Sequence, residues 1–236
     1  ETMVIAEIGC NWKNIEEAKR MIWLANESGA THVKFQAYTQ KDIDEAPEEI
    51  REHLTRIKLN PTKLIKLKEY ADEVGIEFIV TPTSSDRYEM LKKVGVNTIK
   101  IREKDKGNTE LCAPIFTDKK KMIVSTSVIP TLINLVNPNV MWMYCVPKYP
   151  PKLEEIELEK NVPYIRGYSN HYPDIFLPLY AVMLGAEVIE VHVTLERSRN
   201  DIDIKVSIDF DELEQLTHMI CLYEKMRIKR SNDYAL

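Results

Sequence analysis

The sequence predicts a closed (β/α)8 barrel, and three observations support this fold class. Eight apolar runs of strand length alternate with segments of helical pattern, as in a parallel α/β sheet. One sequence pattern, in which a helix ends at a glycine and a strand follows, recurs in SGATHVKF, VGIEFIV, VGVNTIKI and LGAEVIEVHV. The turn after the first strand, GCNWKN, does not have the glycine-rich pattern usual in an open dinucleotide-binding sheet. We therefore expect one barrel domain over residues 1–236.

The first half of the chain is expected to form four strand–helix units. In the first helix, Ile15, Ala18 and Ile22 recur at helical spacing. Pro61 suits the first turn of the second helix, where a missing N–H costs nothing, and the polar, acidic stretch before it is interpreted as an excursion. The expected strands are Met3–Gly9, His32–Tyr38, Glu77–Thr81 and Thr98–Arg102, and the expected helices are Ile15–Ser28, Pro61–Val74, Ser85–Val94 and Thr109–Phe116.

The second half of the chain repeats this alternation. Gly185 and Ala186 end a helix and return the chain to the last apolar strand, and Asp209 is a suitable N-cap for the closing helix. The expected strands are Met122–Thr126, Val140–Val146, Tyr164–His171 and Val188–Leu195, and the expected helices are Pro130–Val136, Leu153–Glu159, Asp174–Leu184 and Asp209–Lys225.

The composition argues against several classes of protein. A formal net charge of -5 is not that of a general nucleic-acid-binding surface, and 29% charged residues suggest an ordinary soluble exterior. No apolar run approaches the roughly 20 residues needed to span a membrane. The cysteines have no spacing typical of a zinc site or a disulfide framework, so a reducing cytoplasm is the expected compartment.

Two histidines are candidate metal ligands. His171 and His192 each lie at the end of an expected strand, and these two strands belong to one strand–helix–strand unit. Side chains alternate along a strand, so Glu190 and His192 share a face. Neutral imidazole is a common ligand of divalent transition metals, and Glu190 or water can complete the site. The alternative is that His171 is a loop residue and His192 an ordinary core residue.

Two lysines lie inside apolar strands, Lys34 in HVKFQAY and Lys100 in TIKIR. A buried lysine is costly unless it is paired. One interpretation is an anion site, in which both ammonium groups meet a carboxylate or phosphate beside the hydroxyl donors Thr81, Ser125 and Ser169. The alternative is a pair of internal salt bridges to Glu7 and Glu190. A metal beside an anion pocket suggests a phosphorylated acid and a carbonyl compound as substrates.

Ordered motifs cover nearly the whole chain: IAEIGCN, GATHVKFQ, GIEFIVTP, IKI, IVSTS, YCVPKYP, GYSNH, LGAEVIEVHVTL and DIDIKVSIDFDEL. In this order they resemble the motifs of the sialic acid synthases, the N-acetylneuraminate synthases and their relatives that make other nonulosonic acids. GYSNH and EVHVT are the most specific, being similar to GYSDH and EKHFT. The resemblance implies a (β/α)8 enzyme that condenses phosphoenolpyruvate with an N-acylated amino sugar such as N-acetylmannosamine. It also implies release of phosphate and use of Mn²⁺, with Mg²⁺ or Co²⁺ as alternatives.

The resemblance implies a role for each candidate residue. His171 and His192 would be the metal ligands. Phosphoenolpyruvate would be held by Lys34, Lys100, Ser125 and Ser169, with Thr81 as a further substrate donor. The sugar or the metal-bound water would be faced by Glu7, Gln36, Tyr149 and Asp203. The expected catalytic residues are Glu7 or Asp203, either of which can take the proton of an attacking water, and Lys100.

The chain departs from the family pattern in four places. Trp12 stands where a histidine is usual, residues 103–105 read EKD instead of SGE, and Val146-Pro147 replaces two polar residues. The family's C-terminal antifreeze-like domain, through which members commonly pair, is not expected within these 236 residues, so a homodimer is left open.

Two hypotheses follow for the function. The first is a metal-dependent synthase acting on phosphoenolpyruvate and an amino sugar. The second is a barrel that has lost the sugar chemistry and acts as a sugar- or phosphate-binding or interaction protein, which the altered loop at 103–105 favours. Arg102, Lys104 and Lys106 either replace lost phosphate contacts or belong to a solvated basic loop. Neither hypothesis includes nucleic acid or a membrane as a partner.

Overall fold

The computed structural model describes residues 1–131 and 137–233. Within these ranges nine strands form one sheet, with every pairing parallel, in which β1 to β8 follow one another in chain order. Pairing of β8 with β1 closes the sheet into a ring, so the predicted (β/α)8 barrel is confirmed. The strands are β1 (Met3–Glu7), β2 (His32–Ala37), β3 (Glu77–Pro82), β4 (Thr98–Ile101), β5 (Lys121–Thr126), β6 (Val140–Tyr144), β7 (Gly167–Asn170), β8 (Val188–Val193) and β9 (Ser207–Ile208).

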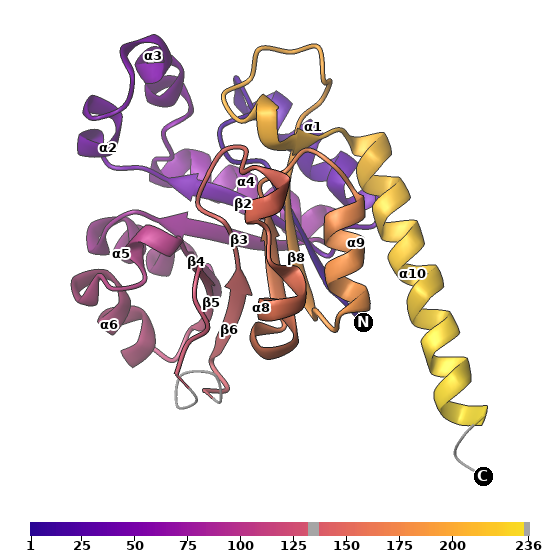
Figure 1. Cartoon of the computed structure of the whole chain (residues 1–236). Helices are drawn as coiled ribbons and strands as arrows, with labels where there is room; N and C mark the ends of the chain where they lie inside the picture. The colour runs from indigo at the N-terminus through magenta and orange to yellow at the C-terminus, as the bar shows by residue number, and fades with distance from the viewer. Residues whose placement is uncertain (132–136, 234–236) are drawn as a thin grey trace.

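Helices surround the strands, and α10 packs beside α9 before running past the end of the barrel (Figure 1). They are α1 (Ile15–Glu27), α2 (Gln40–Asp44), α3 (Glu48–Ile57), α4 (Pro61–Val74), α5 (Ser85–Val94), α6 (Thr109–Thr117), α8 (Leu158–Ile165), α9 (Phe176–Met183) and α10 (Phe210–Asp233), with 3-10 turns η1 (Glu103–Asp105), η2 (Leu153–Glu155) and η3 (Ile204–Val206). Asn14, Asn60 and Ser84 each accept a backbone N–H, so α1, α4 and α5 begin at N-caps. None of the described helices is both long and apolar enough to cross a membrane.

The alternation of side chains along the strands positions the site. A small apolar cluster fills the interior of the barrel: Ile5, Ile79, Ile123, Met143 and Val188. A larger apolar core lies between the outer face of the strands and the helices. Because residues two apart share a face, the strand residues that follow the inner cluster point to the mouth of the barrel. Polar residues can therefore lie together at the mouth of the barrel, next to the apolar cluster that fills its interior.

The stretch between Tyr38 and Pro61 is helical, although the sequence was interpreted there as an acidic excursion. Thr39 and Asp42 form a capping box at the start of α2. Leu54 and Ile57 of α3 are buried, and Ile50 packs against the same core. The sequence pattern that could have predicted this helix is an apolar stripe at helical spacing. It is hard to recognise because many charged residues lie between its members.

Two further boundaries were predicted incorrectly. The helix expected at Leu153–Glu159 is replaced by the turn η2 and the later helix α8. The strand expected to begin at Tyr164 begins at Gly167, because α8 continues until Arg166 takes a left-handed φ of 61°. The short strand β9 was not predicted. The helix expected at Pro130–Val136 falls largely outside the described residues. The helices Pro61–Val74 and Ser85–Val94 have the predicted bounds, and the other predicted elements are present with shifted ends.

Candidate active site

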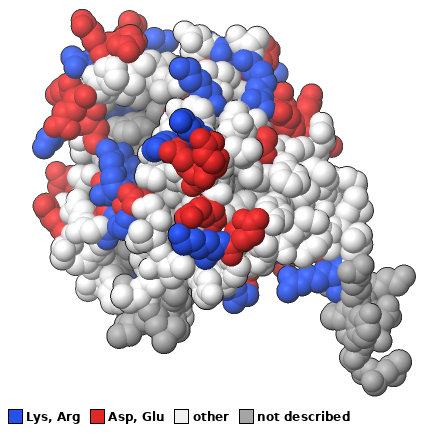
Figure 2. Space-filling view, in the orientation of Figure 1, with Lys and Arg blue, Asp and Glu red and all other residues white. Residues whose placement is uncertain are grey.

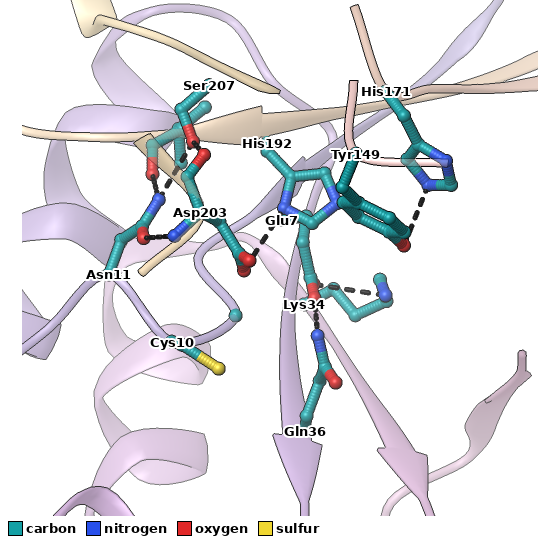
Figure 3. A network of polar contacts seen from close by, with 12 residues as sticks. Glu7, Cys10, Asn11, Lys34, Gln36, Tyr149, His171, His192, Asp203 and Ser207 are labelled. Carbon is teal, nitrogen blue, oxygen red and sulfur yellow. Dashed lines mark hydrogen bonds and ion pairs between the residues drawn. The ribbon is translucent and has the colours of Figure 1, made fainter. Parts of the chain in front are cut away.

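One cavity of about 670 Å³ opens at the C-terminal ends of the strands. Every candidate site residue except Thr81 lines it, namely Glu7, Lys34, Gln36, Lys100, Ser125, Tyr149, Ser169, His171, His192 and Asp203. Thr81 lies behind this surface, where Lys34 Nζ is 3.4 Å from its hydroxyl. The tertiary structure thus brings together residues from all parts of the chain, and Figure 3 shows how part of this network converges.

Buried charges of alternating sign form the floor of the cavity. Lys34 Nζ is 3.1 Å from Glu7 Oε2 and 3.4 Å from Glu190 Oε1, and Lys100 Nζ is 3.6 Å from Glu190 Oε2. Ser169 donates to Glu190 at 3.0 Å. The internal salt bridges considered from the sequence are therefore present. They keep both ammonium groups at the cavity surface, where a bound anion can also reach them.

Burial and pairing act differently on these four charges. Burial raises the pKa of Glu7 above its usual value. For Glu190, burial is outweighed by Lys100 and Lys34, which hold its pKa at about 2. Burial is likewise outweighed at Lys34 by Glu190 and Glu7, so that its pKa is raised, whereas burial lowers the pKa of Lys100. Lys34 is therefore the more firmly protonated of the two cations.

The hydroxyl of Ser125 lies 2.6 Å from Lys100 Nζ, beside Cys145 in the same cavity. Burial raises the pKa of Cys145 to about 11, which favours the protonated thiol near neutral pH. Cys145 could not be recognised from the sequence, because it has no partner cysteine or histidine nearby in the chain. Its place at the end of β6 was the only available signal.

His171 is held as a neutral imidazole. Its Nδ1 is 2.8 Å from the carbonyl oxygen of Val146, which can only accept, so Nδ1 carries the hydrogen. Burial, followed by the proximity of His192, lowers the pKa of His171 to about 3. The lone pair is then on Nε2, which lies 3.1 Å from the hydroxyl of Tyr149. The tyrosine ring stacks on the imidazole with a centroid separation of 4.2 Å.

His192 faces both His171 and Asp203. The two imidazole centroids are 5.6 Å apart, and His192 Nδ1 is 3.5 Å from Asp203 Oδ2. Burial lowers the pKa of His192, but the nearby Asp203 carboxylate has the larger effect, and the pKa of His192 is raised above its usual value. The backbone N–H of Asp203 donates to the side chain of Asn11 at 3.0 Å, and Asn11 also donates to Ser207 at 2.9 Å (Figure 3). Asp203 is therefore positioned by the β1–α1 loop.

The donor set fits a divalent ion with open coordination positions. The Nε2 lone pair of His171 is met by the Tyr149 hydroxyl at 3.1 Å, and His192 Nδ1 makes no hydrogen bond although Asp203 Oδ2 lies 3.5 Å from it. Glu190, considered from the sequence as a third ligand, is instead bound by Lys34, Lys100 and Ser169. Among the described residues no three His, Cys, Asp or Glu side chains are grouped to hold a metal. Water or substrate oxygens would have to supply the remaining ligands.

The rim of the cavity contains the loop at 103–105. Arg102 Nε lies 2.5 Å from Asp105 Oδ2, and Lys106 pairs with Glu103. Glu103 also accepts from Ser127 at 2.7 Å. Arg102, Glu103 and Lys104 line the cavity, whereas Lys106 does not. Much of the charge of this loop is thus neutralised within the loop.

The wall formed by α2 and α3 was not predicted from the sequence. Five residues of this segment line the cavity: Asp42, Glu45, Ala46, Ile50 and Leu54. In the space-filling view the surface is hollowed beside α2 and α3, with basic and acidic side chains around the opening (Figure 2). These residues lie beyond the strand ends, so a search restricted to strand ends could not find them.

Comparison with known proteins gives a consistent result. The NeuB family matches residues 21–231. The uncharacterized protein MJ1065 of Methanocaldococcus jannaschii is 31% identical over 95% of this chain and 72% of its own length. The N-acetylneuraminate-9-phosphate synthase of Homo sapiens is 28% identical over 94% of this chain and 70% of its own. The crystal structure of the N-acetylneuraminic acid (sialic acid) synthetase of Leptospira borgpetersenii serovar Hardjo-bovis, in complex with citrate, has a TM-score of 0.86 at 27% identity, covering 95% of this chain and 84% of that chain.

Proposed function

The chain belongs to the NeuB family, and on that premise we propose that it joins phosphoenolpyruvate to an N-acylated amino sugar, giving a sialic or other nonulosonic acid and phosphate. One observation carries the proposal. The buried cations Lys34 and Lys100 and the imidazoles of His171 and His192 line the same cavity. This pairs an anion site with a site for a carbonyl oxygen, which the two substrates require.

In the proposed reaction, C3 of phosphoenolpyruvate attacks the aldehyde carbon of the sugar. Lys34, Lys100 and the hydroxyls of Ser125 and Ser169 hold the carboxylate and phosphate, so the nucleophile is fixed in position. Water then adds to C2, one of its protons passes to a carboxylate, the former aldehyde oxygen takes up a proton to become a hydroxyl group, and phosphate leaves. Atoms balance as one phosphoenolpyruvate, one sugar and one water giving one 2-oxo acid and one phosphate.

Glu7 is the better proton acceptor of the two candidate carboxylates. Burial raises the pKa of Glu7, whereas for Asp203 burial is outweighed by His192, which lowers the pKa. A carboxylate with the higher pKa is the stronger base. Gln36 donates to Glu7 Oε1 at 2.6 Å and accepts from Tyr38 at 2.7 Å. Gln36 therefore orients Glu7, in addition to any contact that it makes with the sugar.

A divalent ion held by His171 and His192, with Mn²⁺ the first choice and Mg²⁺ or Co²⁺ the alternatives, would polarise the carbonyl oxygen of the sugar. The Nε2 lone pair of His171, whose neighbour is the Tyr149 hydroxyl, and the Nδ1 of His192, which makes no hydrogen bond, support this assignment. Tyr149 would move from His171 Nε2 when that atom binds the ion.

His192→Ala is expected to lower the affinity for Mn²⁺ by about 100-fold, because one of only two protein ligands is lost. His218→Ala, on the exposed part of α10, should bind Mn²⁺ like the unaltered protein. Metal content after dialysis and calorimetric titration would measure both variants, with circular dichroism as the check on folding. Stoichiometric metal retained by His192→Ala would remove His192 from the ligand set.

The central test of the function is the release of inorganic phosphate. Purified protein with Mn²⁺, phosphoenolpyruvate and a panel of 2-acetamido sugars should release phosphate only when a sugar is present. The 2-oxo acid product should appear in equal amount by mass spectrometry. No release of phosphate with any sugar of the panel would favour the second candidate function, a barrel that binds a sugar or phosphate without catalysing the condensation. The internally paired loop of Arg102, Glu103, Asp105 and Lys106 is the observation that favours this second candidate.

A further inference from the structure

The helix α3 turns an apolar stripe toward a cavity whose floor is charged. Ile50 and Leu54 are four residues apart, so they share one face of the helix, and both line the cavity. Ala46, just before α3, lines it as well. Leu54 is 6% exposed, whereas Ile50 is only partly covered by the protein. The stripe formed by Ala46, Ile50 and Leu54 therefore leaves apolar surface facing the cavity.

Hydrogen bonds tie this helix to the floor. His53 Nε2 on α3 lies 2.7 Å from the carbonyl oxygen of Cys10. Cys10 Sγ is 2.9 Å from the hydroxyl of Tyr38, which donates to Gln36 at 2.7 Å. Gln36 in turn donates to Glu7. The apolar wall and the charged floor are thus connected parts of one site.

We propose that the stripe of Ala46, Ile50 and Leu54 contacts the acyl group of the amino sugar and limits its length to a short aliphatic chain. The inference rests on the proposed function, since it names the part of that substrate which α3 recognises. The hydroxyl groups of an amino sugar need polar partners, whereas its acyl chain ends in an alkyl group, the largest continuous apolar part of the molecule, which gains from an apolar wall. The nearby carboxylate of Asp42 accepts from Thr39 and Thr83 through Oδ2, and a free amino group in place of the acyl group would leave the apolar stripe without a partner.

Two substitutions change the length of this pocket in opposite directions. Ile50→Ala deepens the pocket and should shift the ratio of affinities for N-butanoyl- over N-acetylmannosamine upward by about 10-fold or more. Ala46→Leu fills the pocket and should shift the same ratio downward by a similar factor. Ile65→Ala is the matched control, because Ile65 lies on α4, is 40% exposed and does not line the cavity.

The test is calorimetric titration of each sugar into protein with Mn²⁺, which needs no turnover. Opposite shifts in Ile50→Ala and Ala46→Leu, with none in Ile65→Ala, would support the inference. An unchanged ratio in both cavity variants, or preference of the unaltered protein for free mannosamine, would overturn it, as would no binding of any sugar. Binding with the predicted ratios but without phosphate release would uphold the acyl pocket and reject the proposed synthase.

Discussion

Lys100→Met is expected to weaken phosphoenolpyruvate binding by about 1,000-fold while leaving Mn²⁺ affinity nearly unchanged. Methionine matches the length of lysine but has no charge, so a bound anion loses a charge-assisted partner. Lys100 is 2% exposed and its Nζ lies 2.6 Å from Ser125 Oγ, so the ammonium group is held at a fixed place in the floor of the cavity. Glu190 would also lose one of its two cations and would repel the anion more strongly.

The measurement is calorimetric titration of phosphoenolpyruvate in the presence of Mn²⁺. Lys104→Met is the control, since Lys104 lines the same cavity at its exposed rim. It should change the affinity by less than about 10-fold, because an exposed charge contributes little. If Lys100→Met binds phosphoenolpyruvate as the unaltered protein does, Lys100 serves only as the structural partner of Glu190.

Gly167→Ala is expected to destabilise the fold by roughly 3–5 kcal/mol, because the added methyl group overpacks a closed barrel. A Cβ on Gly167 would lie 2.3 Å from the carbonyl oxygen of Trp142, 2.8 Å from Val188 Cγ1 and 3.0 Å from Met143 Cγ. Trp142 and Val188 belong to the strands on either side of β7, and the ring of strands leaves β7 little room to move.

Gly75→Ala is the comparison for the same chemical change. Gly75 has a φ of +83° at the end of α4, and its Cβ would have no neighbour within 4 Å. It should therefore lose only about 1 kcal/mol, the conformational cost of a left-handed alanine. Urea unfolding followed by circular dichroism would give both free energies. Equal losses in the two variants would show that contact with Trp142 is relieved at little cost.

The strand ends could be predicted because their pattern is local. Ile5 lies in the barrel interior, so Glu7 two residues later faces the mouth. The same spacing takes Val188 to Glu190 and then to His192. A reader of the sequence alone can therefore list side chains that share the mouth of the barrel.

The end of α8 and the wall at α3 could not be predicted in this way. Tyr164 and Ile165 are typical of a strand by composition, yet Leu158, Val162 and Ile165 are buried on one face of a helix. In α3 a few apolar residues lie among many charged ones. The apolar stripe can therefore be recognised as part of the site only when a cavity is known to face it. Both outcomes depend on packing partners that are distant in the sequence.

By itself the sequence determined the succession of strands and helices, the alternation of faces and the residues at most strand ends, because each depends on neighbours within a few positions. Only the tertiary structure decided how Lys34 and Lys100 share Glu190, which nitrogen of His171 carries the hydrogen, and that α3 lines the cavity. These contacts depend on distances between strands and loops that come together only when the ring of strands closes. The periodicity of residues along the chain does not contain such distances.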